Sequence, residues 1–302
     1  MSLINKFKTS GKYTKYSVII IMLFSIIVLS LTSIYHVSGD GCWHAQVSRF
    51  ISQNQRIPFF EPLGRDEPFW SPPLYHMTAA FFYYVFDLFN HDAANFAVKF
   101  ISPIFGILSL VFSFLVVRKL ASPIIAFYST IFLAFMPIFI DYSVLSYVES
   151  MLVFFVVLSV YFLINGRIWL CAMAAGLSIL TKYNGIFILP ALLYILYKKQ
   201  SGKKLYKNAS IIIVLPLLIA SPWLIRNWIL LGNPIWPFMN FIFDGYESKS
   251  LAALNLKNLV GLKLLVFTFL GFFGVPDGNP AAFTFAGDIP YAPALLIAWA
   301  AG

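Results

Sequence analysis

The residues best suited to chemistry stand just after the first apolar segment, where residues 39–44 read Gly-Asp-Gly-Cys-Trp-His. A carboxylate beside a membrane can act as a general base toward a bound hydroxyl. Asp40 is therefore the candidate base, and His44 lies one helical turn later if a helix begins early in this stretch. On position alone, an acid that merely ends the first helix at the headgroup layer is the stronger interpretation.

Three further acids, Glu61, Asp66 and Glu67, follow on the next polar stretch around Arg65. Carboxylate oxygens can ligate a divalent cation. No fixed ligand spacing is present, however, so a solvated loop is the favoured interpretation. We predict no metal site; a divalent metal cofactor is an alternative that the spacing does not favour.

Asp141 and Glu149 bracket a short segment, 141–149, between two apolar runs. Glu149 precedes the next apolar run so closely that it must lie at or below the membrane surface. An ionisable group is costly there and is a functional candidate by default. Capping of a helix N-terminus by an acid explains the position equally well.

Two cations lie close to apolar segments: Lys182 within Thr-Lys-Tyr-Asn, and Arg226 within Pro-Trp-Leu-Ile-Arg-Asn. Arginine can bind a lipid phosphate in a bidentate way, and lysine supplies a point charge. The alternative is that each side chain anchors a helix by snorkelling to the interface. For Lys182 both interpretations stand, whereas the prolines around Arg226 favour the phosphate.

The composition places these residues in a polytopic membrane protein. Of the 302 residues, 60% are hydrophobic and 11% charged, and the mean hydropathy is +0.82, whereas soluble domains carry about 25% charged residues. The net charge of +9 arises from short clusters between apolar runs, which argues against nucleic acid. Two cysteines make a disulfide framework improbable, and the motifs of nucleotide-binding loops and zinc proteases are absent.

The apolar segments and their flanking charges predict how the chain crosses the membrane. If 72–90 lies on the outer surface and 168–197 is a hairpin, the cytoplasmic side holds twelve cations and no acid, which leaves nine of the 21 cations with all 12 acids outside. This is the positive-inside distribution, with the N-terminus in the cytoplasm. The candidate segments are 16–36, 72–90, 97–117, 123–140, 151–164, 168–197, 209–230, 259–275 and 291–302.

Two other topologies are weaker. If 72–90 crosses while the hairpin remains, the lysine cluster 198–207 lies outside. If 72–90 crosses and 168–197 is one long span, that cluster returns inside, but the basic residues of 118–119 and 167 are stranded outside.

The elements that position the candidate residues follow from this topology. Each hairpin arm has about 14 residues, or about 21 Å, which is shorter than a hydrocarbon core of roughly 30 Å. The tip with Lys182 should therefore lie recessed in a protein-lined cavity. Apolar residues at helical spacing predict an interfacial helix over 43–57, and Pro72 and Pro73 can open the next helix.

The ordered series of an outer-loop acid, an interfacial helix, Pro-Pro-Leu-Tyr at 72–75, a second acidic loop, Thr-Lys-Tyr and Arg-Asn before Gly-Asn-Pro-Ile resembles the GT-C superfamily of membrane glycosyltransferases. The likeness covers roughly 16–240 and is greatest to the branch of the protein O-mannosyltransferases and the lipid A aminoarabinose transferase. It implies an all-α, polytopic transmembrane helix bundle whose first outer loop lies on the membrane.

The resemblance also implies a function. The donor would be a sugar on a polyprenyl or dolichyl phosphate, transferred with inversion to an acceptor hydroxyl. Asp40 would be the base and Glu149 the second-loop acid, and the other substrate-binding residues would be Lys182, Arg226, His44, Tyr75 and Glu67. Asp40 is followed by glycine, so the paired-acid form of the first-loop motif is absent, and Glu67 is a candidate substitute.

The sequence therefore predicts a single transmembrane domain over 1–302, part of a longer protein because 291–302 is too short to span. The first non-cytoplasmic loop is 37–96, the second is 141–150, and 198–208 is a cytoplasmic basic loop. The expected partners are a lipid-linked donor, a protein, lipid or glycan acceptor, and membrane lipids, but no nucleic acid. A transporter is the alternative from another class, although the acids gather on one side instead of near the midplane; an inactive scaffold is the third.

Overall fold

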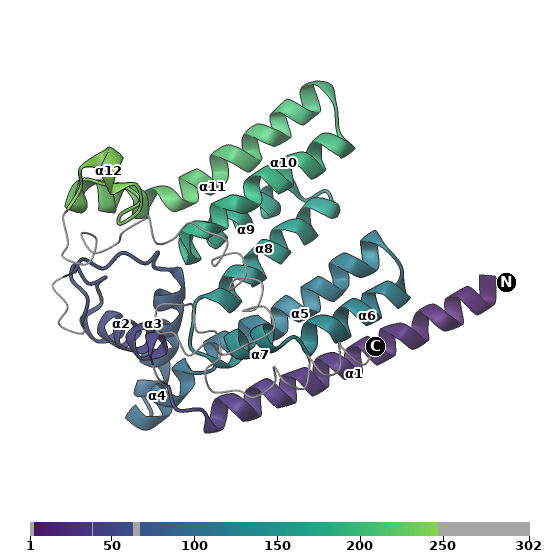
Figure 1. Cartoon of the computed structure of the whole chain (residues 1–302), viewed down its shortest axis with the longest axis horizontal. Helices are drawn as coiled ribbons and strands as arrows, with labels where there is room; N and C mark the ends of the chain where they lie inside the picture. Colours follow the sequence, from purple (N-terminus) through teal and green to yellow (C-terminus); the bar gives the residue numbers. More distant parts are fainter. Residues whose placement is uncertain (1–2, 38, 63–66, 247–302) are drawn as a thin grey trace, which may run out of the picture.

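The computed structural model describes residues 3–37, 39–62 and 67–246, and this part of the chain is an elongated bundle of helices (Figure 1). The predicted segments 259–275 and 291–302, and the sites Arg65 and Asp66, lie outside the described residues. The helices of the first half are α1 (Leu3–Ile34), α2 (Asp40–Asn54), α3 (Leu74–Asp87), α4 (His91–Val98), α5 (Ile101–Leu120), α6 (Pro123–Ala134) and α7 (Pro137–Val144).

The second half of the described chain continues the bundle. Its elements are α8 (Glu149–Ile164), α9 (Ile168–Thr181), the 3-10 helix η1 (Tyr183–Phe187), α10 (Ile188–Lys199), α11 (Gly202–Leu231) and the short α12 (Asn240–Phe243).

Within the described residues, three helical runs are long and apolar enough to cross a membrane: Gly11–Ile34, His91–Leu120 and Gly202–Leu231. Helices α6 and α7 pass the same test together but are bent by 62° where Pro137 begins α7. Helix α3, in the segment predicted to lie on the outer surface, is not one of these runs. The multi-pass character predicted from composition is confirmed.

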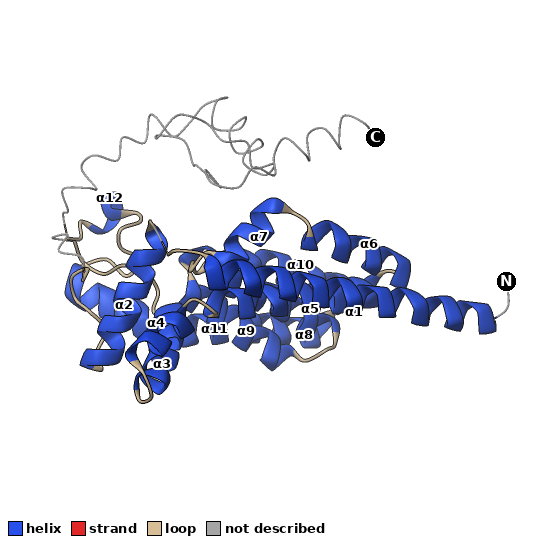
Figure 2. Ribbon diagram, turned by 90° about the horizontal axis from the view of Figure 1, so that it is seen from below, coloured by secondary structure: helices blue, strands red, loops and turns tan. Residues whose placement is uncertain are grey.

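The bundle has one end with short turns and one with long connections. The turns α5/α6, α8/α9 and α10/α11 all lie at the end where the chain begins, whereas α2, α3 and α4 gather at the opposite end (Figures 1 and 2). Lys119 Nζ donates a hydrogen bond to Asn165 Oδ1, which ties two of the short turns together. Arg118, Lys119, Lys198 and Lys199 also complement the negative C-terminal ends of α5 and α10.

The predicted hairpin is present, and close packing recesses its tip. Leu163, Ile168, Leu192, Leu196 and Ile212 share one buried cluster, in which α9 packs against α8 and α11 and α10 contacts the same two helices. The tip turns at η1, where a Cβ on Gly185 would lie 2.4 Å from the backbone of Ser178. Because only glycine fits there, the chain can reverse within one turn of the end of α9.

Two boundaries differ from the sequence prediction. The interfacial helix begins three residues earlier, at Asp40, because Gly39 has φ 54° and an acid in the first turn suits the helix N-terminus. The loop predicted at 141–150 is also shorter in the structure, because α7 continues through Asp141 to Val144 and α8 begins at Glu149. Proline opens the α3 region as predicted, with Pro73 as its N-cap.

Candidate active site

The centre of the candidate site is an ion pair between the hairpin tip and the start of α8. Lys182 Nζ lies 2.6 Å from Glu149 Oε1, although 33 positions separate the two residues in the chain. The two side chains are 33% and 27% exposed, so the pair is recessed and still open to solvent. Lys182 has the extended backbone conformation that separates α9 from η1.

Asp40 lies beside Tyr147, whose pKa the charge of Glu149 also influences. It is the exposed first residue of α2, and a Cβ on the neighbouring Gly39 would lie 3.7 Å from the Tyr147 hydroxyl. Burial raises the pKa of Tyr147, and the charges of Asp40 and Glu149 raise it further, while a hydrogen bond with the backbone of Asp40 lowers it. Both predicted acids therefore act on the same tyrosine from different loops.

His44 lies behind the acids in a buried histidine pair. His44 Nδ1 lies 2.8 Å from His76 Nε2, so one ring donates a hydrogen bond and the other accepts it. Burial lowers the pKa of His76 to about 3 and the pKa of His44 well below 6.5; the charges of His76 and Lys182 lower the latter further. Both rings are therefore neutral at physiological pH and act as hydrogen-bonding wall residues.

Tyr75 is fully buried and belongs to the frame of the site. Its hydroxyl lies 3.2 Å from Ser102 Oγ, which donates to the backbone oxygen of Tyr147 at 2.9 Å. Burial is the main cause that raises the Tyr75 pKa. Ser102 thus connects the Tyr75 hydroxyl to the backbone of Tyr147.

Arg226 and Glu67 lie at the edge of this group. Arg226 lies over the Trp223 ring, 4.6 Å from its centroid, and is linked through Asn227 to Tyr183, the residue after Lys182. Glu67 lies in the loop between α2 and α3, where its backbone oxygen accepts from the Glu61 amide at 2.9 Å. Among the described residues, no hydrogen bond or ion pair links the Glu67 carboxylate to Asp40, Glu149 or Lys182.

The sequence interpretation gave no role to His76 or Tyr183. Each is the partner of a predicted residue or its neighbour: His76 holds His44, and Tyr183 links the tip to α11. The available signal was their position: His76 directly follows Pro-Pro-Leu-Tyr, and Tyr183 is part of Thr-Lys-Tyr.

The ligand chemistry of the described residues offers no ready metal centre. In residues 3–37, 39–62 and 67–246, no group of three His, Cys, Asp or Glu side chains comes together. Asp66, one of the three acids considered for a cation, is outside that part of the chain.

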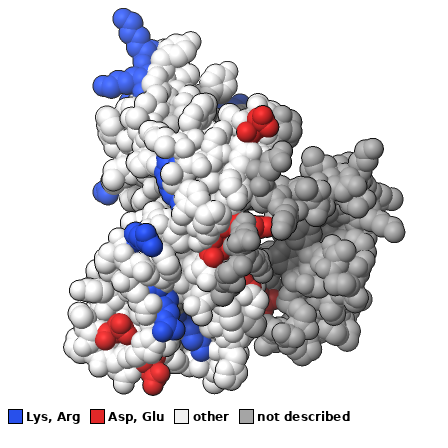
Figure 3. Space-filling view, turned by 90° about the vertical axis from the view of Figure 1, so that its left-hand side faces the viewer, with Lys and Arg blue, Asp and Glu red and all other residues white. Residues whose placement is uncertain are grey.

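On the end of the bundle that carries α2–α4, acidic and basic side chains are both visible (Figure 3).

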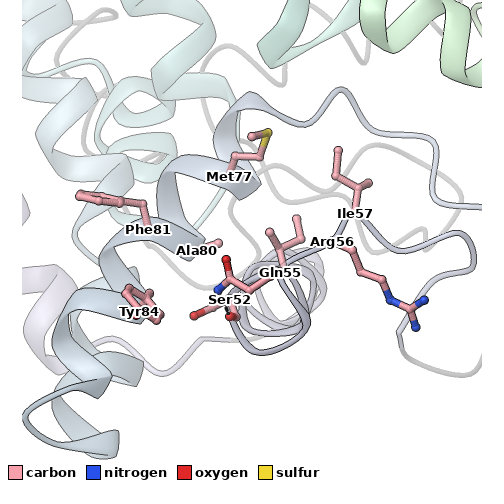
Figure 4. A pocket seen from close by; sticks show the side chains of 9 residues that line it. Ser52, Gln55, Arg56, Ile57, Met77, Ala80, Phe81 and Tyr84 are labelled. Atoms are coloured by element: carbon pink, nitrogen blue, oxygen red, sulfur yellow. Dashed lines mark hydrogen bonds between the residues drawn. The ribbon is translucent and has the colours of Figure 1, made fainter.

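A cavity of about 340 Å³ lies between the C-terminal half of α2 and α3, away from these groups (Figure 4). Met77, Ala80, Phe81 and Tyr84 line it from α3, Ile51 and Ser52 from α2, and Gln55, Arg56 and Ile57 from the segment that follows α2. None of the predicted site residues lines this cavity. The cavity is therefore separate from the charged groups described above.

Comparison with known proteins identifies the class and then the family. A fold similar to this one is found in the crystal structures of ArnT from Cupriavidus metallidurans bound to undecaprenyl phosphate (TM-score 0.59, 19% identity, 93% of this chain and 50% of that chain) and in the apo state (0.55, 19%, 75% and 44%). The Archaeoglobus fulgidus oligosaccharyltransferase in the apo form is also similar (0.57, 13%, 94% and 36%). The chain thus has the fold of the GT-C membrane glycosyltransferases.

Residues 70–226, just over half of the chain, match the model of the dolichyl-phosphate-mannose-protein mannosyltransferase family. The chain belongs to this family, as the sequence resemblance predicted. No curated protein matches the sequence. The chain spans half or less of the length of the structures it resembles.

Proposed function

We propose that this chain forms the donor-binding and catalytic part of a membrane glycosyltransferase, which moves a sugar from a polyprenyl- or dolichyl-phosphate donor to an acceptor hydroxyl on the non-cytoplasmic face. The observation that carries the proposal is the ion pair of Lys182 with Glu149 at 2.6 Å, near Tyr147, whose pKa the charges of Asp40 and Glu149 both raise. Membership of the family and the shared fold with ArnT, which has been seen with undecaprenyl phosphate, support a lipid-phosphate donor.

The proposed reaction is a single displacement at the anomeric carbon. The acceptor oxygen attacks C1, the bond from C1 to the phosphate oxygen breaks, and its electron pair leaves with the phosphate. Asp40 takes the acceptor proton, and attack opposite the leaving group inverts the configuration. Such a reaction needs a base on the acceptor side and a cation on the phosphate side.

Lys182 is the cation we assign to the donor phosphate. In the structure its charge is paired with Glu149 at 2.6 Å, so an arriving phosphate would exchange with that carboxylate and leave Glu149 facing the sugar. His44 and Tyr75 would form the buried wall of the site, and Glu67 its rim.

Replacement of the proposed base tests the function most directly. In membranes that contain the full-length protein, Asp40→Asn should lower transfer of labelled sugar from a polyprenyl-phosphate donor by roughly 10²–10⁴-fold, the usual contribution of a general base. Asp92→Asn, which changes an exposed acid in the first turn of α4, is the matched control and should leave transfer within about two-fold.

The outcomes separate the alternatives. Unchanged transfer by Asp40→Asn would refute Asp40 as the base. Absence of transfer with every lipid-linked donor tried, by wild type as well as variant, would reject the glycosyltransferase and favour a transporter or an inactive scaffold.

A further inference from the structure

The guanidinium of Arg226 is directed at neutral acceptors. Nη2 donates to the backbone oxygen of Pro58 at 2.8 Å, and Nη1 donates to the backbone oxygen of Phe69 at 3.4 Å and to Asn227 Oδ1 at 2.8 Å. The side chain is partly buried, with its guanidinium carbon 4.6 Å from the centroid of the Trp223 ring. An arginine in this setting holds backbone in place, because its rigid fork can reach several acceptors at once.

The two carbonyls belong to two arms of the first outer loop, residues 57–62 and 67–70. The arms are joined by backbone hydrogen bonds from the Glu61 amide to the Glu67 oxygen at 2.9 Å and from the Phe69 amide to the Phe59 oxygen at 2.8 Å. Arg226 bonds to one carbonyl on each arm, from 168 and 157 positions away. It therefore fastens both arms to the end of α11.

The same arginine is linked to the hairpin tip by side chains. Asn227, fully buried, accepts from Arg226 and donates from Nδ2 to the Tyr183 hydroxyl at 2.9 Å. Trp223 donates from Nε1 to the same hydroxyl at 2.9 Å, and its ring packs on Phe69. Tyr183 follows Lys182 directly, so one connected network joins the outer loop, α11 and the residue that carries the proposed phosphate-binding charge.

We propose that Arg226 is a positioning residue that fastens the arms of the outer loop to α11 and, through Asn227 and Tyr183, to the hairpin tip that carries Lys182. The contact with a lipid phosphate that the sequence suggests for Arg226 is thereby replaced by contacts with the protein's own carbonyls. The effect on sugar transfer rests on the proposed function, whereas the fastening of the loop does not.

Hydrogen–deuterium exchange on the purified full-length protein tests the fastening independently of activity. Arg226→Gln should speed exchange of the Glu61 and Phe69 amides by about ten-fold or more, because it removes hydrogen bonds from a charged donor. Arg226→Lys keeps the charge but loses the fork, so it should speed exchange nearly as much. Arg56→Gln, which removes an exposed cation just before the first arm, should leave both amides unchanged.

Two results would overturn the proposal: wild-type exchange at both amides in Arg226→Gln, or full protection restored by Arg226→Lys. If Arg226→Gln does not fold, Asn227→Ala tests the second part of the proposal, which is the link from Arg226 to the hairpin tip. It should speed exchange in residues 183–187 while the arms keep their protection, and unchanged exchange there would refute the link to the tip.

Transfer kinetics then separate fastening from phosphate binding. Fastening predicts that the Lys and Gln variants of Arg226 both lower kcat by a similar factor, with donor KM within about three-fold of wild type. Direct phosphate contact predicts a large rise in donor KM for Arg226→Gln that Arg226→Lys largely reverses, and that pattern would overturn the proposal. If wild type transfers no sugar, the proposed function fails, but the exchange experiment still decides the fastening.

Discussion

The two ends of the bundle are built in opposite ways. At the end where the chain begins, the turns α5/α6, α8/α9 and α10/α11 are short and basic (Figure 1). At the other end, long connections fold into α2, α3 and α4, and polar side chains pair below the surface, among them His44 with His76 and Lys182 with Glu149.

The difference indicates that the two ends have different roles. Short turns with cations fix neighbouring helices and satisfy the helix C-termini, which needs no exact side-chain geometry. The long connections cover the bundle and so create buried polar positions, where each group must find a partner. Chemistry that depends on geometry is therefore expected only at the end with α2–α4.

The largest expected difference between the ends concerns their lysines. Lys182→Gln should lower sugar transfer by roughly 10²–10³-fold, because it removes the charge that meets the leaving phosphate. Lys198→Gln combined with Lys199→Gln, at the basic end, should change transfer by less than about two-fold. Initial rates with a saturating lipid-linked donor measure both.

If the Lys182 variant and the Lys198/Lys199 variant lose sugar transfer to a similar extent, the proposed difference between the ends is wrong. Loss of positive charge at either end would then be enough to lower transfer. Lys99→Gln is a useful additional control, because Lys99 lies at the same end as Lys182 and contacts the Ser33 backbone oxygen at 3.4 Å. It should behave like the basic-end variants.

The second prediction concerns pH and the buried histidine pair. The pKa of His76 is lowered by burial to about 3 in the folded protein, against about 6.5 when unfolded. Between these values the unfolded chain binds a proton that the folded chain does not. Stability should therefore be complete above pH 6.5 and fall as pH drops toward 3, by at most about 1.4 kcal/mol per pH unit for one histidine.

Thermal unfolding in detergent, followed by tryptophan fluorescence at pH 7.5, 6.0 and 5.0, measures this dependence. His76→Gln should lower the Tm at pH 7.5, because His44 loses its ring partner, but should flatten the decline toward pH 5. A decline as steep as that of wild type would show that other groups are responsible.

The prediction with the smallest expected effect concerns which side of the membrane each end of the bundle faces. Cys42 is exposed in α2 and Cys171 is buried, and these are the only two cysteines of the chain. A membrane-impermeant maleimide should therefore label intact cells at Cys42 if the site faces outward. Cys42→Ser should abolish labelling and leave transfer nearly unchanged; labelling only after the membrane is opened would place the site on the cytoplasmic side.

Much of the fold follows from hydropathy and charge. The apolar runs predicted the bundle, and the charge clusters predicted the hairpin of α9 and α10, because a single span would have placed basic turns on both sides. The boundary at Asp40 was predicted three residues late, since a conformation such as that of Gly39 has no signal in hydropathy. Asp141 was assigned to a loop because an acid between apolar runs resembles one, yet it lies inside α7.

The sequence by itself determined the class of protein and the family resemblance, because these depend on composition and local spacing. Only the tertiary structure decided the partners: Lys182 with Glu149, His44 with His76, and Arg226 with the carbonyls of Pro58 and Phe69. The physical reason is that every residue carries a backbone carbonyl. The sequence therefore does not show which carbonyl, more than 150 positions away, accepts from Arg226, because tertiary packing decides this.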